Sequence, residues 1–401
     1  SSAMLSTEAF DLVGSEKSYP SQLESMETWQ PRRLFFNTSW WFYGSRENFE
    51  KADKSNLISV DTGVFYPILG LSNNELASMA SSQHKCQGFG RLTTRGSETE
   101  YLEIIKGDLP QGEQSIFEGI DTSWSRIEGG DKIGEILYAV EENFNFTNPS
   151  VHLNELLKAY SLLQNVSDDH WKTIKSEELK NLIGSVSGLY LEAATTSPVT
   201  VPGSEVTVKV EALNRSDLPL TLKAIKVNGI DIDNTALALQ NNKKENIEFQ
   251  VSVPDNASYT SPYWLNKKGT LGMYSVEDTD LIGKPEAPEA YIAQFDLDFN
   301  GTRISLERPL VYRYSEPDQG ELYRPFEVLP AVTCSFEDKV VIFSNGATRS
   351  IPVKIRAEKD GISGSVSLAI SDNWKVANNQ QEFSLSQKGE EVTLTFDVTP
   401  P

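Results

Sequence analysis

Hydrophobic positions in the first part of the chain switch between helical and strand spacing. Near the start, apolar residues recur every three or four positions, at Met4, Leu5, Ala9, Leu12 and Val13. This spacing predicts a helix over residues 2–12 that ends at Gly14. Apolar runs at residues 33–42 and 56–61 predict two strands. Since an amphipathic helix is already under way at the first residues, we expect the natural protein to extend upstream.

Helical spacing returns in three further places. Asn73 and Asn74 are suited to cap a helix, which is predicted over residues 75–86. Leucine-rich helical spacing then covers residues 131–144 and residues 150–185. Because helices and strands are interspersed up to this point, the sequence predicts a mixed α/β fold for this part of the chain.

The pattern changes near residue 186, where apolar and polar positions begin to alternate. Alternation of period 2, interrupted by turn signals, is typical of β-sandwiches. We therefore expect an α/β domain with a helical extension at residues 1–185, followed by two Ig-like β-sandwich modules at residues 186–322 and 323–401. The strands predicted for the last module include residues 339–343, 351–355, 366–370 and 392–398.

Composition limits the partners of this 401-residue chain. Its net charge is −21 and its pI is about 4.7, so it should repel phosphate backbones, and no nucleic-acid partner is expected. No apolar run reaches the length of a membrane-spanning helix, so no span is expected. Cys86 and Cys334 fall in different predicted domains, which argues against a mutual disulfide. The oligomeric state and the redox compartment are left open.

The motifs of common catalytic and metal sites are missing from the sequence. His84, His152 and His170 are scattered, whereas a zinc site needs three or four converging ligands. Residues 184–188 resemble a nucleophile elbow, but Val186 stands where the nucleophile would be. The sequence thus predicts no catalytic residue and no metal ligand in this chain.

One calcium-loop pattern is formally complete. It runs from Asp296 through Asp298, Asn300 and Gly301 to Glu307. Such a loop needs flanking helices, whereas apolar and polar residues alternate on both sides of this one. Asn-Gly between alternating runs is a hairpin signal. The sequence therefore predicts a β-hairpin whose two aspartates face solvent.

Two features are candidates for ligand binding. His84 and Gln87 lie three residues apart, on one face of the predicted helix, which fits either a ligand cleft or a local helix cap. The aromatic run at residues 40–43, followed by Arg46, fits either a surface that stacks on sugar rings or ordinary core and loop packing.

Several stretches resemble the PIG-L (LmbE-like) deacetylases, in particular the long multidomain members of Bacteroidetes type. His84 and Gln87 resemble the late His-x-Ser-Gln helix of that family, with Cys86 in place of the serine. Other stretches carry the likeness in order along most of the chain, at residues 8–10, 29–34, 117–121, 262–265, 308–312 and 320–325.

The resemblance implies a partial Rossmann-like domain and zinc-dependent hydrolysis of an N-acetyl group, typically on N-acetylglucosamine-containing substrates. In that family a His-Pro-Asp-Asp motif and a later histidine hold the zinc, and an aspartate of the motif acts as base on the zinc-bound water. This chain contains none of them, so zinc is implied only for the full-length protein. Asp61, His84 and Gln87 match family positions near the active site, and we expect them to act as substrate-side or supporting residues.

Two functions are compatible with this resemblance. The first is a portion of a deacetylase that is inactive alone and carries accessory sandwich modules. The second is a non-catalytic carbohydrate-binding or scaffold protein of the cell envelope. Both imply a carbohydrate or glycoconjugate partner and a periplasmic, secreted or envelope location.

Overall fold

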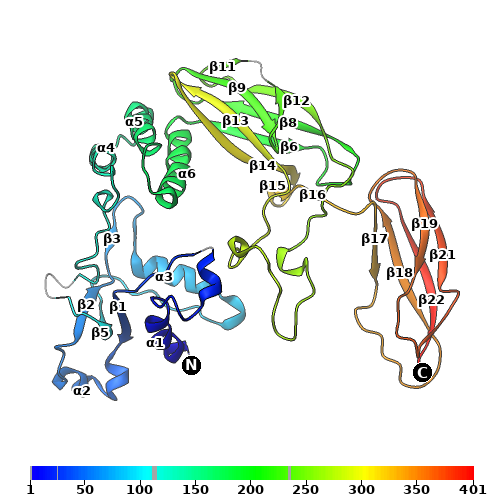
Figure 1. The fold of residues 1–401 in the computed structure, drawn as a ribbon, viewed down its shortest axis with the longest axis horizontal. Helices are drawn as coiled ribbons and strands as arrows, with labels where there is room; N and C mark the ends of the chain where they lie inside the picture. Colours follow the sequence, from blue (N-terminus) through cyan, green and yellow to red (C-terminus); the bar gives the residue numbers. More distant parts are fainter. Residues whose placement is uncertain (1, 25, 111–114, 234–235) are drawn as a thin grey trace. The chain divides into compact units, whose positions relative to one another are not determined.

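Two compact units make up the chain, Ser1–Ser123 and Trp124–Pro401 (Figure 1). The computed structural model describes residues 2–24, 26–110, 115–233 and 236–401. Helices are mixed with many strands in several sheets, as the hydrophobic pattern predicts. The Rossmann-like and Ig-like assignments are not confirmed, and the bounds of the three predicted domains remain predictions.

A three-stranded antiparallel sheet forms the centre of the first unit, in the order β1-β5-β2. Its strands are β1 (Arg33–Thr38), β5 (Thr99–Gly107) and β2 (Leu57–Asp61). The other elements are α1 (Ser2–Leu12), η1 (Pro20–Glu24), η2 (Trp40–Tyr43), α2 (Arg46–Lys51), β3 (Phe65–Tyr66), β4 (Leu71–Ser72), α3 (Asn73–Ser82) and η3 (Lys85–Gln87). Helix α1 and strand β2 confirm the predicted elements. The strand predicted over residues 33–42 ends at Thr38, because the aromatic run after it forms a 3-10 turn.

Helix α3 begins and ends earlier than predicted. The Ser72 side chain accepts a hydrogen bond from the Glu75 backbone, and the Glu75 carboxylate accepts one from the Ser72 backbone. This reciprocal capping box starts the helix, so the prediction that Asn73 and Asn74 cap it is wrong. The helix then stops at Ser82, and His84 has left the helical conformation.

The first unit buries few apolar side chains. Among its described residues, Phe49 and Ile58 are the apolar residues that are buried. The Phe49 ring packs edge-on against Tyr43 at 5.0 Å and against Tyr101 at 4.9 Å. Many large apolar side chains of this unit therefore lie at its surface.

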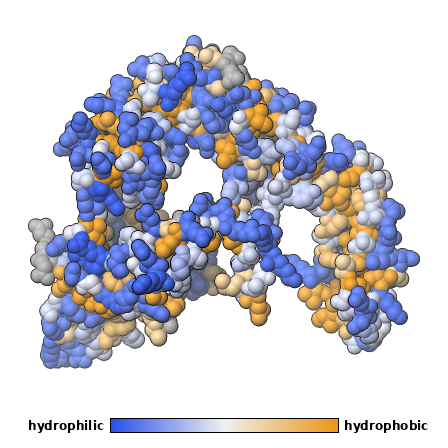
Figure 2. Space-filling model, in the orientation of Figure 1, coloured by the Kyte–Doolittle hydropathy of each residue, from blue (hydrophilic) through white to orange (hydrophobic). Residues whose placement is uncertain are grey.

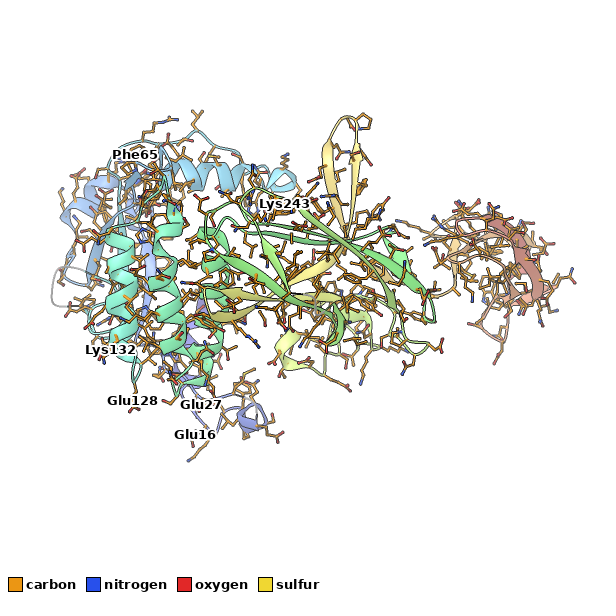
Figure 3. The ribbon with its side chains drawn as sticks, turned by 90° about the horizontal axis from the view of Figure 1, so that it is seen from above. Glu16, Glu27, Phe65, Glu128, Lys132 and Lys243 are labelled. Atoms are coloured by element: carbon orange, nitrogen blue, oxygen red, sulfur yellow. The ribbon has the colours of Figure 1, made fainter. Side chains whose placement is uncertain are left out.

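Three helices open the second unit. They are α4 (Asp131–Glu142), α5 (Leu153–Leu163) and α6 (Asp169–Val186), and they lie side by side (Figure 3). The predicted helical stretch at residues 150–185 is divided, because Asp168 caps α6 by accepting a hydrogen bond from the Trp171 backbone. No helix in the described part of the chain has the length and apolar character needed to cross a membrane.

A nine-stranded sheet follows, in the order β10-β9-β13-β14-β6-β8-β12, with β11 paired to β9 and β15 paired to β14. Its strands are β6 (Tyr190–Thr195), β8 (Glu205–Leu213), β9 (Leu220–Val227), β10 (Ile230–Asp233), β11 (Leu237–Leu239), β12 (Glu245–Ser252), β13 (Ile292–Phe299), β14 (Thr302–Glu316) and β15 (Gly320–Pro325). The long strand β14 joins the two halves of this sheet. Its first part pairs with β13, and its second part pairs with β6 and β15.

One apolar core unites the helices with this sheet. On β13, every second side chain is fully buried, as for Phe295 and Phe299. Leu156 of α5 and Ile183 of α6 belong to the same cluster. We call residues 124–328 the central module, since this core extends from Ile127 to Val328.

The last part of the chain forms a smaller pair of sheets, ordered β17-β18-β22-β20 and β19-β21. The strands are β17 (Val332–Phe336), β18 (Arg349–Ala357), β19 (Ile362–Ser367), β20 (Lys375–Ala377), β21 (Gln380–Leu385) and β22 (Glu391–Thr399). Just before these strands in the sequence, β16 (Glu327–Val328) pairs in parallel with β7 (Val199–Thr200), and both belong to the central module. The strands predicted at 351–355 and 392–398 are confirmed. The strand predicted at 339–343 is wrong, because Val340 and Ile342 alternate but stay exposed outside the sheets.

Candidate functional site

His84 and Gln87 are brought together, although not by the predicted helix. His84 precedes the 3-10 turn η3, and its Nδ1 lies 3.2 Å from the Gln87 Oε1. Both side chains are exposed, and the His84 ring lies 6.0 Å from the ring of Phe89. The two exposed side chains therefore hydrogen-bond to each other across this turn.

Asp61 organises a different place in the first unit. At the end of β2, its carboxylate accepts hydrogen bonds from the Gly63 backbone at 2.8 Å, the Ser97 hydroxyl at 2.8 Å and the Glu98 backbone at 3.1 Å. These bonds, that from Gly63 foremost, hold the pKa of Asp61 below its usual range. The carboxylate thus ties two loops together, and its hydrogen bonds go to these loops rather than to His84 or Gln87.

The strongest surface feature of the first unit is an aromatic cluster, which we define as Phe36, Trp40, Trp41, Phe42 and Arg46. The Arg46 guanidinium lies 5.3 Å from the Trp40 ring centroid, and the Phe42 ring packs edge-on against Phe36 at 4.9 Å. In a 3-10 turn, successive side chains point in directions about 120° apart, so four consecutive aromatic residues do not all reach one core. Trp41 is 71% exposed as a result.

The histidines do not provide a zinc site. The His152 Nε2 accepts a hydrogen bond from the Asn145 backbone, and its ring stacks on Phe144. His170 packs edge-on against Trp171. In the described ranges, no three or more His, Cys, Asp or Glu side chains are grouped so as to hold a metal ion. The described residues therefore do not offer a ligand set for the zinc that the resemblance implies for the full-length protein.

The calcium-loop pattern folds as the predicted hairpin. Phe299 pairs with Thr302 across a two-residue turn in which Asn300 and Gly301 both have positive φ. Asp298 accepts a hydrogen bond from the Gly301 backbone, which closes the turn. Asp298, Asn300 and Gly301 of the calcium-loop pattern thus form the turn of this hairpin.

Asp296 lies in a polar network on the same hairpin. Its carboxylate accepts hydrogen bonds from Ser305 at 2.5 Å and Gln294 at 2.8 Å, and it lies 3.6 Å from the Lys226 ammonium. Burial raises the pKa of Asp296, but these hydrogen bonds and the Lys226 charge outweigh it and hold the pKa below its usual value.

Asp296→Asn is expected to make the stability of the central module less sensitive to acid. The folded pKa lies below the unfolded value of 3.8, so the carboxylate stabilises the fold above that pH. Its contribution is lost as the pH falls through the lower folded pKa. Denaturant unfolding at about pH 6 and about pH 3 measures the difference between wild type and variant, which should shrink at the lower pH. A difference that stays constant with pH would contradict the assignment.

A cavity that the sequence did not predict lies beside Tyr263 and Trp264. The stretch at residues 262–265 is singled out in the sequence only as part of the resemblance. In the structure, this stretch interrupts the strand pattern between β12 and β13. Tyr263 lines one hollow, and Trp264 lines two others. The signal in the sequence that could have indicated this cavity was a dense group of aromatic residues and prolines outside any predicted strand.

Comparisons with known proteins do not identify a family. No protein-family model matches the chain, and no curated protein matches it. Among solved structures, the CARDB domain of a Pyrococcus furiosus protein, in complex with di-metal ions, is 12% identical and has a TM-score of 0.19, over 35% of this chain and 89% of that one. Red sea bream transglutaminase is 12% identical with a TM-score of 0.26, over 58% of this chain and 30% of that one. A Porphyromonas gingivalis protein of unknown function is 11% identical with a TM-score of 0.16, over 53% and 83%. TM-scores this low do not indicate a shared fold.

Proposed function

We propose that this chain is the non-catalytic, carbohydrate-binding portion of a PIG-L-type deacetylase of the periplasm or cell envelope. In this proposal, the zinc ligands of the family belong to other parts of the full-length protein, and residues 1–185 form the latter part of its Rossmann-like domain. The mixed sheets of the second unit act as accessory modules of Ig-like type. The residue likeness that includes His84, Gln87 and Asp61 supports the family.

The observation that carries the proposal is the aromatic cluster. Trp and Tyr rings combine a large apolar face with tolerance of water, so they are well suited to a ligand that is apolar on one face and polar at its rim. A pyranose ring has this character, with C–H groups on its face and hydroxyls around its edge. Trp41 and Phe42 are both exposed, and the Arg46 guanidinium beside Trp40 adds hydrogen-bond donors for those hydroxyls.

Trp41→Ala is expected to weaken the binding of N-acetylglucosamine oligomers about tenfold, because it removes the most exposed ring of the cluster. Isothermal titration of the chain with chitotetraose measures the affinity. Trp29→Ala is the matched control, since Trp29 is also 71% exposed in the first unit but lies outside the cluster.

Three outcomes separate the alternatives. Binding that is lost in Trp41→Ala and kept in Trp29→Ala supports the proposal. Failure of the wild-type chain to bind any N-acetylglucosamine oligomer contradicts it. If the chain binds these oligomers but the full-length protein releases no acetate from them, the protein is a non-catalytic envelope component.

A further inference from the structure

The central module contains a long segment that leaves its sheet. Strand β12 ends at Ser252 and β13 begins at Ile292, and the segment between them contains the 3-10 turns η6 (Tyr263–Leu265) and η7 (Thr279–Leu281). In Figure 1 it is the yellow-green excursion, and Figure 2 shows hydrophobic surface in orange at its end. Where this segment leaves the sheet, it borders an open cavity of about 400 Å³. That volume is within the range of small-molecule sites.

Hydrogen bonds hold the walls of this cavity in place. The Asn228 side chain donates to the Ala290 carbonyl at 3.0 Å and accepts from the Ile292 backbone at 2.9 Å. Thr260 exchanges two bonds with Val328, one through its backbone N–H at 2.8 Å and one through its hydroxyl at 2.9 Å. The cavity is therefore formed before any ligand arrives, which lowers the entropy lost on binding.

The lining is uncharged, although the chain as a whole is 23% charged with a net charge of −21. Its walls combine aromatic rings with neutral polar groups, chiefly Tyr259, Tyr263, Tyr291, Ser258, Asn266 and Asn228. Tyr259 is 56% exposed, so much of its side chain is available to a ligand. An uncharged, hydroxyl- and amide-rich wall with aromatic faces favours a neutral ligand that carries both hydroxyls and apolar C–H groups.

A second hollow of about 280 Å³ adjoins the first and shares Thr260, Ser261 and Pro288 with it. It is lined by Trp264, whose ring packs edge-on against Tyr263 at 4.9 Å. Three carboxyl groups, those of Glu286, Glu289 and Glu327, also lie in its wall, and their negative charge disfavours an anionic ligand. Burial, together with the Glu286 charge, raises the pKa of Glu289.

We propose that these adjoining hollows form a two-subsite binding site for an uncharged disaccharide of N-acetylated pyranoses. One ring stacks on Tyr259. Ser258 and Asn266 line the same cavity and hydrogen-bond to the hydroxyls or the acetamido group of that ring. The second ring lies against Trp264. This inference rests on the proposed carbohydrate-binding function and gives the central module a site separate from the aromatic cluster.

Tyr259→Ala is expected to weaken the binding of N,N′-diacetylchitobiose to the whole chain about tenfold, since the stacking face is lost. Saturation-transfer NMR and calorimetric titration report this affinity. Tyr138→Ala is the matched control, because Tyr138 is 49% exposed on α4 of the same module and lines neither of the two hollows. Asn266→Asp, which places a charge in the neutral wall, should also weaken binding.

The outcomes distinguish this site from the aromatic cluster. Loss of chitobiose binding in Tyr259→Ala, with binding kept in Tyr138→Ala, supports the site. Binding that is lost in Trp41→Ala but unchanged in Tyr259→Ala overturns this inference and leaves the proposed function standing. Absence of binding by the wild-type chain overturns both. Equal affinity for methyl glucuronide, an anionic pyranoside, would overturn the selectivity for neutral sugars.

Discussion

Ile183→Ala in α6 is expected to lower the free energy of unfolding of the central module by about 3 kcal/mol, the range found for large-to-small changes in a close-packed core. Ile183 is fully buried, and it belongs to the same core cluster as Phe295 of β13. Gly184, its neighbour, lies so close to Leu306 of β14 that an added Cβ would contact that side chain at 3.4 Å. The change therefore removes packing that the helix and the sheet share.

Thermal unfolding followed by both helical and aromatic circular dichroism tests this coupling. Helices and sheet should lose stability together, in one transition at a lower temperature. Ile174→Ala on the same helix is the control, because Ile174 is partly exposed and should change the transition little. If the helical signal alone shifted, the helices would fold separately from the sheet, as the predicted boundary at residue 185 implies.

Gly63→Ala is expected to destabilise the first unit by about 3 kcal/mol, at the upper end of the cost of overpacking. A Cβ at this position would lie 1.9 Å from the Gly96 carbonyl oxygen and 2.8 Å from the Ser97 Cα. Both are backbone atoms, so the loops must move apart. That movement would also break the hydrogen bonds by which Asp61 holds Gly63 and Ser97.

Gly90→Ala is the control for this change, since nothing lies within 4 Å of a Cβ built there. Limited proteolysis, with fragments identified by mass, reports the opening of the first unit in each variant. Faster cleavage near residues 61–98 in Gly63→Ala and an unchanged rate in Gly90→Ala are expected. Equal rates in the two variants would show that the loops accommodate the added methyl group.

Elements whose pattern repeats over many residues could be predicted from the sequence. Helix α1, helix α4 and strand β8 follow directly from spacing, because each has a periodic set of apolar positions. The hairpin at Asn300 and Gly301 could also be predicted from the sequence. A two-residue turn between its strands needs positive φ at both residues, and Asn-Gly is the pair that adopts it most readily.

The errors arose where local chemistry overrides periodicity. At residues 40–43 the aromatic run looks like a strand, but it forms a 3-10 turn before the cap of α2 at Ser45. The pair His84 and Gln87 meets across a turn rather than along a helix. At residues 339–343 the alternation is present, but a strand also needs a neighbour, and pattern alone does not supply one.

The cavity could not be predicted from the sequence for a different reason. Its walls join Asn228, Tyr259 and Val328, which come from a turn, an irregular segment and a short strand far apart along the chain. Spacing rules describe neighbours within one element, so they contain no information about such a convergence. The uncharged character of the lining emerges only when these positions are seen together.

The path of β14 also bears on how quickly the central module folds. Its parallel contact with β6 is reinforced where the Thr195 hydroxyl donates to the Val311 carbonyl, 116 residues along the chain. Contacts between such distant residues form slowly, because the entropy of closing the loop is lost before the contact stabilises the fold. The hairpin of β13 and β14 can form early, since its strands are adjacent in sequence. We therefore expect the joining of this hairpin to β6 to be a slow step of folding, during which the edge of β6 is open to pairing with other chains.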